Sequence, residues 1–107
     1  MKGEALKGHL DLLLLTALLA RPAHGYAIAE TLRTRSKGAF DLPEGTLYPA
    51  LHRLEGAGLV TSRWSERSGR RRRVYQLTAK GLRVMARRQE EWRDFARAVR
   101  CVVEGAA

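Results

Sequence analysis

Cysteine, acidic residues and long apolar runs are all scarce in this sequence of 107 residues. Its single cysteine, Cys101, excludes an internal disulfide framework and fits a reducing compartment. The longest largely apolar run, residues 12–20, has nine residues, whereas a helix that crosses a bilayer needs about 20. The first residues also lack the layout of a signal peptide. We therefore expect a cytoplasmic protein with no membrane partner.

Recognisable catalytic and metal-binding patterns are lacking as well. The three histidines, His9, His24 and His52, lie far apart, and none has a cysteine or carboxylate at the spacing of zinc ligands. The chain has no glycine-rich loop of the kind that holds phosphates. Cys101 is more typical of a small apolar residue than of a nucleophile. The sequence thus predicts no enzyme, no catalytic residue, no metal and no cofactor.

The shortage of acidic residues is greatest in one short segment. The chain holds 20 Lys and Arg against 11 Asp and Glu, a net charge of +9. Residues 61–77 contain six arginines and one acid, Glu66, and so contribute +5 of that total. A localised positive field attracts a polyanion, and nucleic acid is the commonest one. An anionic membrane is a weaker alternative, because no basic amphipathic segment with exposed aromatic residues accompanies the arginines.

Two helices are predicted in the first third of the chain. Leucine and alanine dominate from Leu6 to Ala20, which predicts a helix that is apolar nearly all round. Arg21-Pro22 should end it. A second helix is expected from Tyr26 to Ser36, because Lys37-Gly38 is a favourable helix end.

A third helix is expected from Pro43 to Glu55, since proline suits a first helical turn. Its buried side is predicted to consist of Leu47, Ala50, Leu51 and Leu54. Pro49 lies deep in this helix and removes a backbone hydrogen bond. We therefore expect a distorted or late first turn around Thr46.

Two strands should follow, at residues 59–64 and 72–77, joined by a turn at Ser68-Gly69. They form a β-hairpin with a basic tip. Side chains alternate along a strand, so Arg73 shares a face with Tyr75 whereas Arg72 shares the other face with Val74. Successive arginines therefore point apart, and no single surface can use all four residues from Arg70 to Arg73.

The last helix should begin after Thr78, a good N-cap. Its apolar positions recur at alternating spacings of three and four residues, with one polar break, which is a heptad seam. The seam consists of Leu82, Met85, Gln89, Trp92, Ala96, Val99 and Val103. A helix of about 26 residues is roughly 39 Å long, longer than a small domain can cover. We expect a homodimer through this seam, the alternative being that it packs only on the first helix of its own chain.

The order of helices and strands predicts a mainly α protein with a small β-hairpin, namely a winged helix-turn-helix at residues 1–78 and a dimerisation helix at residues 79–107. The sequence also resembles the PadR-type transcriptional regulators, in their small subfamily with a single C-terminal helix. The resemblance covers most of the chain. It rests on "LDLLLLTALLARPAHGYAI" (10–28), "LPEGTLYPALHRLEGAGLV" (42–60), "SGRRRRVYQLTAKG" (68–81) and the tryptophan of "EEWRDF" (90–95).

This resemblance implies that the third helix enters the major groove of double-stranded DNA and that the hairpin, the wing, reaches neighbouring phosphates or the minor groove. The DNA-binding residues predicted on this basis are Thr46, Tyr48, Pro49, His52, Arg53, Arg70, Arg71, Arg72 and Lys37. Arg35 is a secondary candidate, and Arg73 is expected to stack beside Tyr75 or Trp64. The alternatives are that Tyr48 is a core aromatic residue, that His52 is uninvolved and that the arginines form a solvated loop.

The resemblance further implies a repressor that binds a palindromic operator and an apolar pore between paired final helices. There, a tryptophan stacks on flat ligands. Trp92 would occupy that place, with Gln89, Met85 and Ala96 lining the rest of a pocket for a small aromatic or hydrophobic effector. Alternatively, Trp92 only fills the interface. A different function, in which the basic wing binds protein or RNA, also fits the charge distribution.

Overall fold

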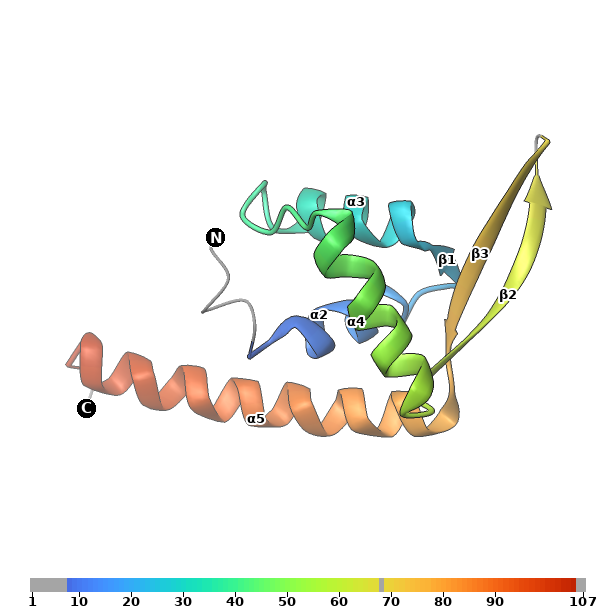
Figure 1. The fold of residues 1–107 in the computed structure, drawn as a ribbon. Coiled ribbons are helices and arrows are strands. Elements are labelled where there is room, and N and C mark those ends of the chain that lie inside the picture. Colours follow the sequence, from blue (N-terminus) through green and yellow to red (C-terminus); the bar gives the residue numbers. More distant parts are fainter. Residues whose placement is uncertain (1–7, 68, 106–107) are drawn as a thin grey trace.

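The computed structural model describes residues 8–67 and 69–105 of the chain. Mainly helical, it contains one small antiparallel sheet and a long C-terminal helix (Figure 1), as predicted. In chain order the elements are α2 (Leu10–Ala17), β1 (Ala23–His24), α3 (Gly25–Arg35), α4 (Glu44–Gly56), β2 (Val60–Arg67), β3 (Arg70–Leu77) and α5 (Ala79–Val103).

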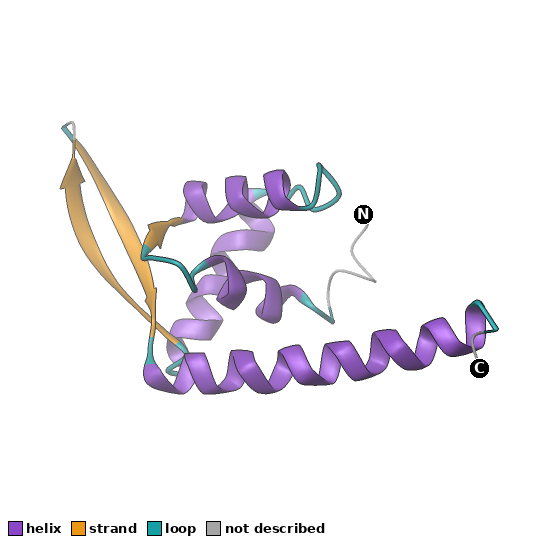
Figure 2. Ribbon diagram, turned by 180° about the vertical axis from the view of Figure 1, so that it is seen from behind, coloured by secondary structure: helices purple, strands orange, loops and turns teal. Residues whose placement is uncertain are grey.

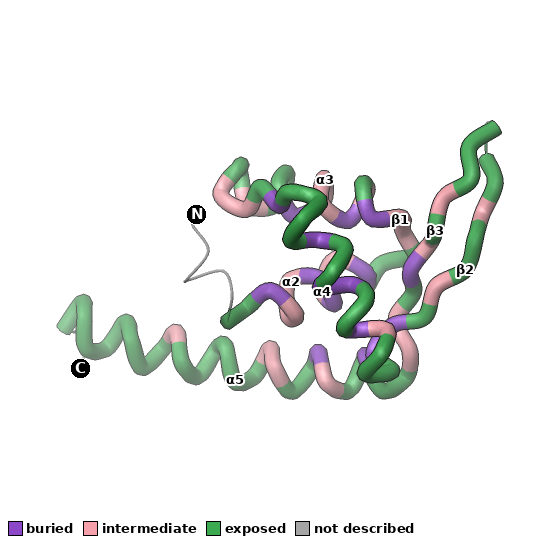
Figure 3. Tube along the Cα trace, in the orientation of Figure 1, coloured by how far each residue is buried: buried purple, intermediate pink, exposed green. Residues whose placement is uncertain are grey.

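The core lies where α2, α3 and α4 meet the first turns of α5 (Figure 3). Helix α4 buries the four residues that its periodicity predicts, Leu47, Ala50, Leu51 and Leu54, each at most 2% exposed. They meet Leu14 and Leu15 of α2 and Ile28 of α3 in one cluster. The opposite face of α4 is left free, because one stripe of a helix is enough to anchor it.

Helix α2 is shorter than the apolar run predicts. The predicted residues before position 8 lie outside the described part, and the helix ends at Ala17 rather than Ala20. The backbone N–H groups of Leu18 and Leu19 donate to Leu15 and Thr16, so the last turn tightens there. The chain must leave the helix early because Ala23 and His24 pair with β3 as an additional strand. This third strand was not predicted.

Pro49 does not delay the start of α4, so that prediction is wrong. The helix begins at Glu44, and the N–H groups of Thr46 and Leu47 both donate to the Pro43 carbonyl, at 2.9 and 3.0 Å. Pro49 stands only a few residues into the helix, where it removes the single bond that its N–H would have made to Gly45.

The sheet has the strand order β1-β3-β2, and both pairings are antiparallel. Strands β2 and β3 are longer than predicted, because the ladder continues to the pair Arg67 and Arg70 beside the turn. The hairpin stands away from the helices (Figure 2). All four consecutive arginines therefore lie on a strand, with alternating sides, rather than in a loop.

Helix α5 begins as predicted, with the Thr78 hydroxyl accepting a hydrogen bond from the Gly81 N–H at 2.9 Å. Gly81 lies against the backbone of Leu59, where a Cβ atom would fall 1.9 Å from the carbonyl oxygen. The helix runs for 25 residues. Its C-terminal half projects beyond the other elements and is almost entirely exposed (Figures 1 and 3).

Candidate nucleic-acid interface

The free face of α4 carries four of the predicted DNA-binding residues, because the buried leucines turn the positions between them outward. Thr46, Tyr48, Pro49 and His52 are all exposed. Tyr48 is 41% exposed, so it is not a core aromatic residue. Its ring instead lies against Gly25, where an added Cβ would come within 2.6 Å of the ring. Because Gly25 has no side chain, the Tyr48 ring can pack against the start of α3.

Arg53 differs from the other predicted residues of α4. Its guanidinium forms an ion pair with Asp11 of α2, and Arg88 of α5 lies 3.9 Å from the same carboxylate. Asp11 therefore draws Arg53 towards the helices of the core. Arg53 thus links α4 to α2 in the free protein, but its side chain is 58% exposed, so its contact with DNA stays a prediction.

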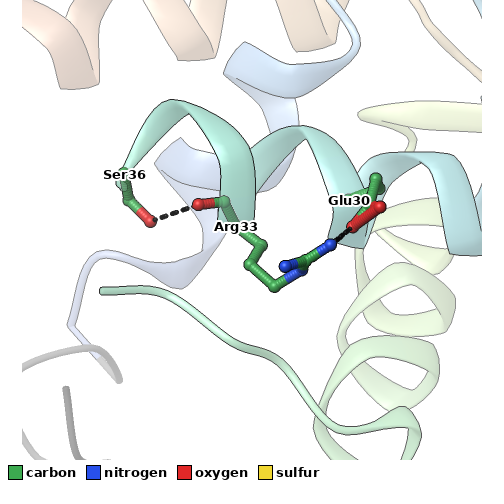
Figure 4. Close-up of polar contacts among 3 residues, drawn as sticks. All are labelled: Glu30, Arg33 and Ser36. Atoms are coloured by element: carbon green, nitrogen blue, oxygen red, sulfur yellow. Dashed lines mark hydrogen bonds and ion pairs between the residues drawn. The ribbon is translucent and has the colours of Figure 1, made fainter. Parts of the chain in front are cut away.

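The end of α3 adds exposed cations beside α4. Glu30 holds Arg33 in an ion pair (Figure 4), and this hydrogen bond and the carboxylate charge raise the pKa of the Arg33 guanidinium. The Ser36 hydroxyl donates to the Arg33 carbonyl at 3.3 Å. Lys37, in the left-handed conformation with φ 55°, is exposed and forms no ion pair with the described residues. Lys37 is therefore available to an anionic partner.

The two faces of the hairpin carry different residues, as the register of β2 and β3 requires. The inner face, which looks towards α4, consists of Val60, Ser62, Trp64, Glu66, Arg71, Arg73, Tyr75 and Leu77. The outer face consists of Thr61, Arg63, Ser65, Arg67, Arg70, Arg72, Val74 and Gln76. The predicted phosphate contacts are thereby divided, with Arg71 on the inner face and Arg70 and Arg72 on the outer face.

The arginines of the inner face are held by their neighbours. Arg73 lies over the Trp64 ring, 5.1 Å from its centroid, which confirms the predicted stacking. Arg71 lies 4.5 Å from the same centroid. Arg73 also donates to Ser62 at 2.8 Å, and Ser62 donates to Glu55 of α4 at 2.7 Å. These contacts tie the base of the hairpin to α4.

An open groove separates α4 from the inner face of the hairpin. Four aromatic residues line it, namely Tyr26, Tyr48, Trp64 and Tyr75. Tyr26 and Trp64 are 68% and 52% exposed, and neither was predicted to belong to the DNA surface. The sequence could have predicted that Tyr26 is exposed, because it lies outside the apolar stripe of α3. The role of Trp64 depends on the hairpin register, which pairs Trp64 with Arg73 and which the predicted turn at Ser68-Gly69 already implies.

His24 joins α3 to the hairpin through both ring nitrogens. Its Nδ1 accepts from the Ala27 N–H at 3.1 Å and caps α3, whereas its Nε2 lies 2.8 Å from Arg72 Nη1. Because Nδ1 accepts from Ala27, the neutral ring carries its hydrogen on Nε2, so Arg72 makes a close contact there rather than donating a hydrogen bond to it. A protonated ring would face an N–H donor at each nitrogen and gain no acceptor. Burial, and then the charge of Arg72, lower the pKa of His24.

The predicted seam of α5 has two parts. Met85 is 4% exposed and belongs to the core of its own chain, so it does not line a free surface. Gln89 and Ala96 are half-buried, whereas Leu82, Trp92, Val99 and Val103 are exposed. Phe95 and Val102, at 57% and 83% exposed, extend this apolar surface and were not predicted.

Trp92 lies at a shallow hollow between α5 and the start of α2. The His9 ring meets it edge-on, with centroids 5.2 Å apart, and Phe95 is 6.3 Å away. Leu12 and Arg88 line the same hollow. Both helices therefore contribute to one uncovered apolar surface.

No group of three or more potential metal ligands gathers within residues 8–67 and 69–105. Over the same residues, no helix is both long enough and apolar enough to span a bilayer.

Comparison with known proteins identifies the family to which the chain belongs. Residues 14–87 match the model of the transcriptional regulator PadR-like family. The chain belongs to this family. The PadR-like chain is 37% identical over 76 residues to the transcriptional regulator Rv3488 of Mycobacterium tuberculosis, covering 71% of this chain and 68% of that protein.

Solved structures of similar proteins share the fold. A transcriptional regulator from Clostridium thermocellum superposes with a TM-score of 0.87 at 28% identity, over 94% of this chain and 99% of that one. A PadR family regulator from Eggerthella lenta gives a TM-score of 0.82 at 33% identity, over 94% and 87%. These relatives are transcriptional regulators rather than enzymes. Membership of the PadR-like family implies regulation through DNA binding.

Proposed function

We propose that this PadR-like regulator is a cytoplasmic repressor that binds a palindromic operator as a homodimer and is released by a small aromatic or hydrophobic effector. Residues 1–78 would hold the DNA, and α5 would hold the second copy. The observation that carries the proposal is the apolar face of α5, which extends beyond the domain that it packs on.

That face is continuous along the helix. Gly81 and Met85 are buried against the chain's own core, and positions 92, 96, 99 and 103 follow them on the same side at heptad spacing. The His9 ring of the same chain meets Trp92, and the C-terminal half of α5 projects beyond the other elements (Figure 1), so this side is left without cover there. A second copy in the same arrangement supplies an identical apolar surface, and a two-fold axis lets each cover the other.

The DNA-facing residues lie at the other end of the molecule. The start of α4, the end of α3 and the tip of the hairpin lie on one side, and α5 lies on the opposite side (Figure 1). Thr46, Tyr48, Pro49 and His52 would meet the major groove, with Lys37, Arg70, Arg71 and Arg72 on phosphates. Hydroxyl and phenol groups can donate to base edges or phosphates. Two such surfaces in a dimer match half-sites about 34–36 Å apart.

The effector proposal rests on Trp92. Its indole is 45% exposed beside the half-buried Gln89 and Ala96, so a flat ligand could stack between the two copies. Binding there would change the angle between the paired helices and thus the separation of the two α4 helices, shifting the population away from the DNA-bound state. Met85 lies in the core of its own chain and is not part of this pocket.

The proposal is tested by selecting bound duplexes from a random library and by measuring sedimentation at micromolar concentration. We expect an enriched palindrome and a dimer. A folded monomer that enriches no sequence would refute the proposal. Tight binding to RNA or to every duplex alike would favour a wing that acts as a general electrostatic surface.

A further inference from the structure

The groove between α4 and the inner face of the hairpin, here called the aromatic groove, combines exposed rings with positive charge. Tyr26, Trp64 and Tyr48 are 68%, 52% and 41% exposed, whereas Tyr75 is buried. The four arginines at positions 70–73 also line the groove, and its lining residues include no acid. Its volume is about 1100 Å³, enough for a ligand larger than a single ring.

The gathering of exposed rings in one groove indicates a binding partner, whereas single apolar residues scattered over a surface are normal. Double-stranded DNA does not account for these rings. Its bases are stacked on one another, and it presents only base edges and phosphates to a protein. The partner that fits the rings is therefore a planar aromatic group with an uncovered face, on which an aromatic side chain can stack.

The arginines indicate that this partner is also an anion. The guanidinium carbons of Arg71 and Arg73 lie 4.5 and 5.1 Å from the centroid of the Trp64 ring. A guanidinium that lies over a ring keeps N–H groups at its edge for an anion. Glu66 is the cross-strand partner of Arg71, but it does not line the groove. Four adjacent arginines match a group with several phosphate charges better than a single carboxylate.

The distribution of charge gives the groove a direction. A neighbouring hollow shares Tyr48 and Trp64 with it, and Glu55 of α4 lines that hollow. Tyr26 lines the side that carries the arginines and not the hollow beside Glu55. A ligand that is both aromatic and anionic therefore places its ring against Tyr26 and its charge on the arginines, away from the carboxylate.

We propose that the aromatic groove binds a free nucleoside diphosphate, with its base stacked on Tyr26 and its phosphates on Arg71 and the neighbouring arginines. Tyr48 belongs both to the groove and to the predicted DNA-binding face of α4, so the bound nucleotide excludes the operator. This site is separate from the effector pocket proposed at Trp92. Nucleotide binding itself does not depend on the proposed function, and only the exclusion of the operator rests on it.

The experiment is isothermal titration calorimetry of the full chain without DNA, at low and constant ionic strength, with ADP, inorganic pyrophosphate and adenosine as probes. ADP should bind about tenfold or more tightly than either of its parts, because only ADP engages both the ring and the arginines. Tyr26→Ala should weaken ADP by about tenfold and leave the affinity for pyrophosphate within about twofold. Tyr26→Phe is the matched control and should keep the affinity for ADP, because it keeps the ring.

A second pair of variants tests the charge. R71Q should weaken ADP and pyrophosphate alike. R67Q removes the same charge from the outer face of the hairpin, outside the groove, and should change either affinity by less than about twofold, because solvent and salt screen an exposed charge. A fluorescence readout places the ligand, since Trp92→Phe leaves Trp64 as the one tryptophan of the chain. ADP should quench the emission of Trp64 with the midpoint that calorimetry gives.

Exclusion of the operator is measured by anisotropy with the selected duplex. ADP at ten times its own Kd should raise the apparent Kd for the operator by about tenfold, as expected for ligands that cannot bind together. The same concentration of ADP should have a much smaller effect on Tyr26→Ala.

Four results would overturn the inference. Pyrophosphate that binds as tightly as ADP would indicate charge alone. An unchanged affinity of Tyr26→Ala for ADP, or an unchanged Trp64 emission, would place the nucleotide elsewhere. A short single-stranded oligonucleotide that binds more tightly than ADP and depends on Tyr26 would assign the groove to a nucleic-acid strand. ADP binding that leaves operator affinity unchanged would remove the exclusion. If ADP binds as expected but the library selection enriches no operator, the proposed function alone has failed.

Discussion

At the scale of single residues, Gly81 shows how one missing side chain allows α5 to join the core. A Cβ atom at this position would meet the Leu59 carbonyl oxygen at 1.9 Å, a backbone atom that cannot rotate away. We expect Gly81→Ala to destabilise the fold by about 3 kcal/mol or more, with a fall in Tm of roughly 10 °C or more. Calorimetry at equal protein concentration would measure it.

The control for this prediction is Gly56→Ala at the end of α4, where nothing lies within 4 Å of the added Cβ. That variant should be neutral or slightly stabilising, because alanine loses less backbone entropy than glycine. Similar Tm values for the two variants would show that α5 does not approach the Leu59 backbone this closely.

His24 gives a prediction for pH at the same scale. Its pKa is lowered by burial and by Arg72, so the unfolded chain takes up this proton before the folded chain does. The stability contributed by neutral His24 is therefore present above its ordinary pKa of about 6.5 and is lost as the pH falls from there towards the folded pKa. The Tm should drop between about pH 7.5 and about pH 5.

Asparagine is the matched replacement, because it can still accept the capping hydrogen bond from Ala27 but does not titrate. The Tm of His24→Asn should therefore change less over the same pH range than that of the wild type. If the Tm of both proteins fell by the same amount, another group would be responsible for the acid sensitivity.

At the scale of elements, the polar residues of α4 differ in whether they contact the rest of the chain. Thr46 lies on the free face, whereas Arg53 pairs with Asp11 of α2. We expect Thr46→Ala to weaken operator binding by about 1–3 kcal/mol, since the hydrogen bond from its hydroxyl to a base edge or a phosphate in the major groove is lost. Arg53→Gln should change operator affinity by no more than about twofold and stability by under about 1 kcal/mol, as is usual for an exposed ion pair.

Anisotropy titrations with the selected operator would separate the two variants. Alanine is a good helix former, so Thr46→Ala should retain the fold of α4. A larger loss of DNA affinity for Arg53→Gln than for Thr46→Ala would mean that the ion pair with Asp11 opens on DNA and that Arg53 does bind the duplex.

At the scale of the whole molecule, the exposed half of α5 should determine the oligomeric state. Val99 is 41% exposed on the apolar side of the helix. A charge there would have to be buried between two copies, so Val99→Glu should shift the sedimentation profile towards monomer. Cys101→Glu is the control, because Cys101 lies about 200° around the helix from Val99 and therefore faces away from the apolar side. Dissociation by both substitutions, or by neither, would refute the predicted dimer surface.

Much of the fold could be predicted because it is encoded locally. The buried stripe of α4, the Thr78 cap and the alternation of arginines on the hairpin follow from periodicities of about 3.6 and 2 residues and from capping chemistry. The candidate site was only partly predictable. Tyr48 and Thr46 lie on the free face as expected, whereas the ion pair of Arg53 with Asp11, 42 positions earlier in the chain, could not be predicted. Trp64 acquires its place from pairing with Arg73.

By itself, the sequence determined the four helices and the hairpin, their order, and where the positive charge is concentrated, because these depend on neighbouring residues. Only the tertiary structure decided that α2 ends early to supply β1, that Met85 belongs to the chain's own core while Trp92 stays exposed, and that Arg53 pairs with Asp11. Each of these outcomes depends on the positions of residues far apart in the chain, which meet only when the elements pack together.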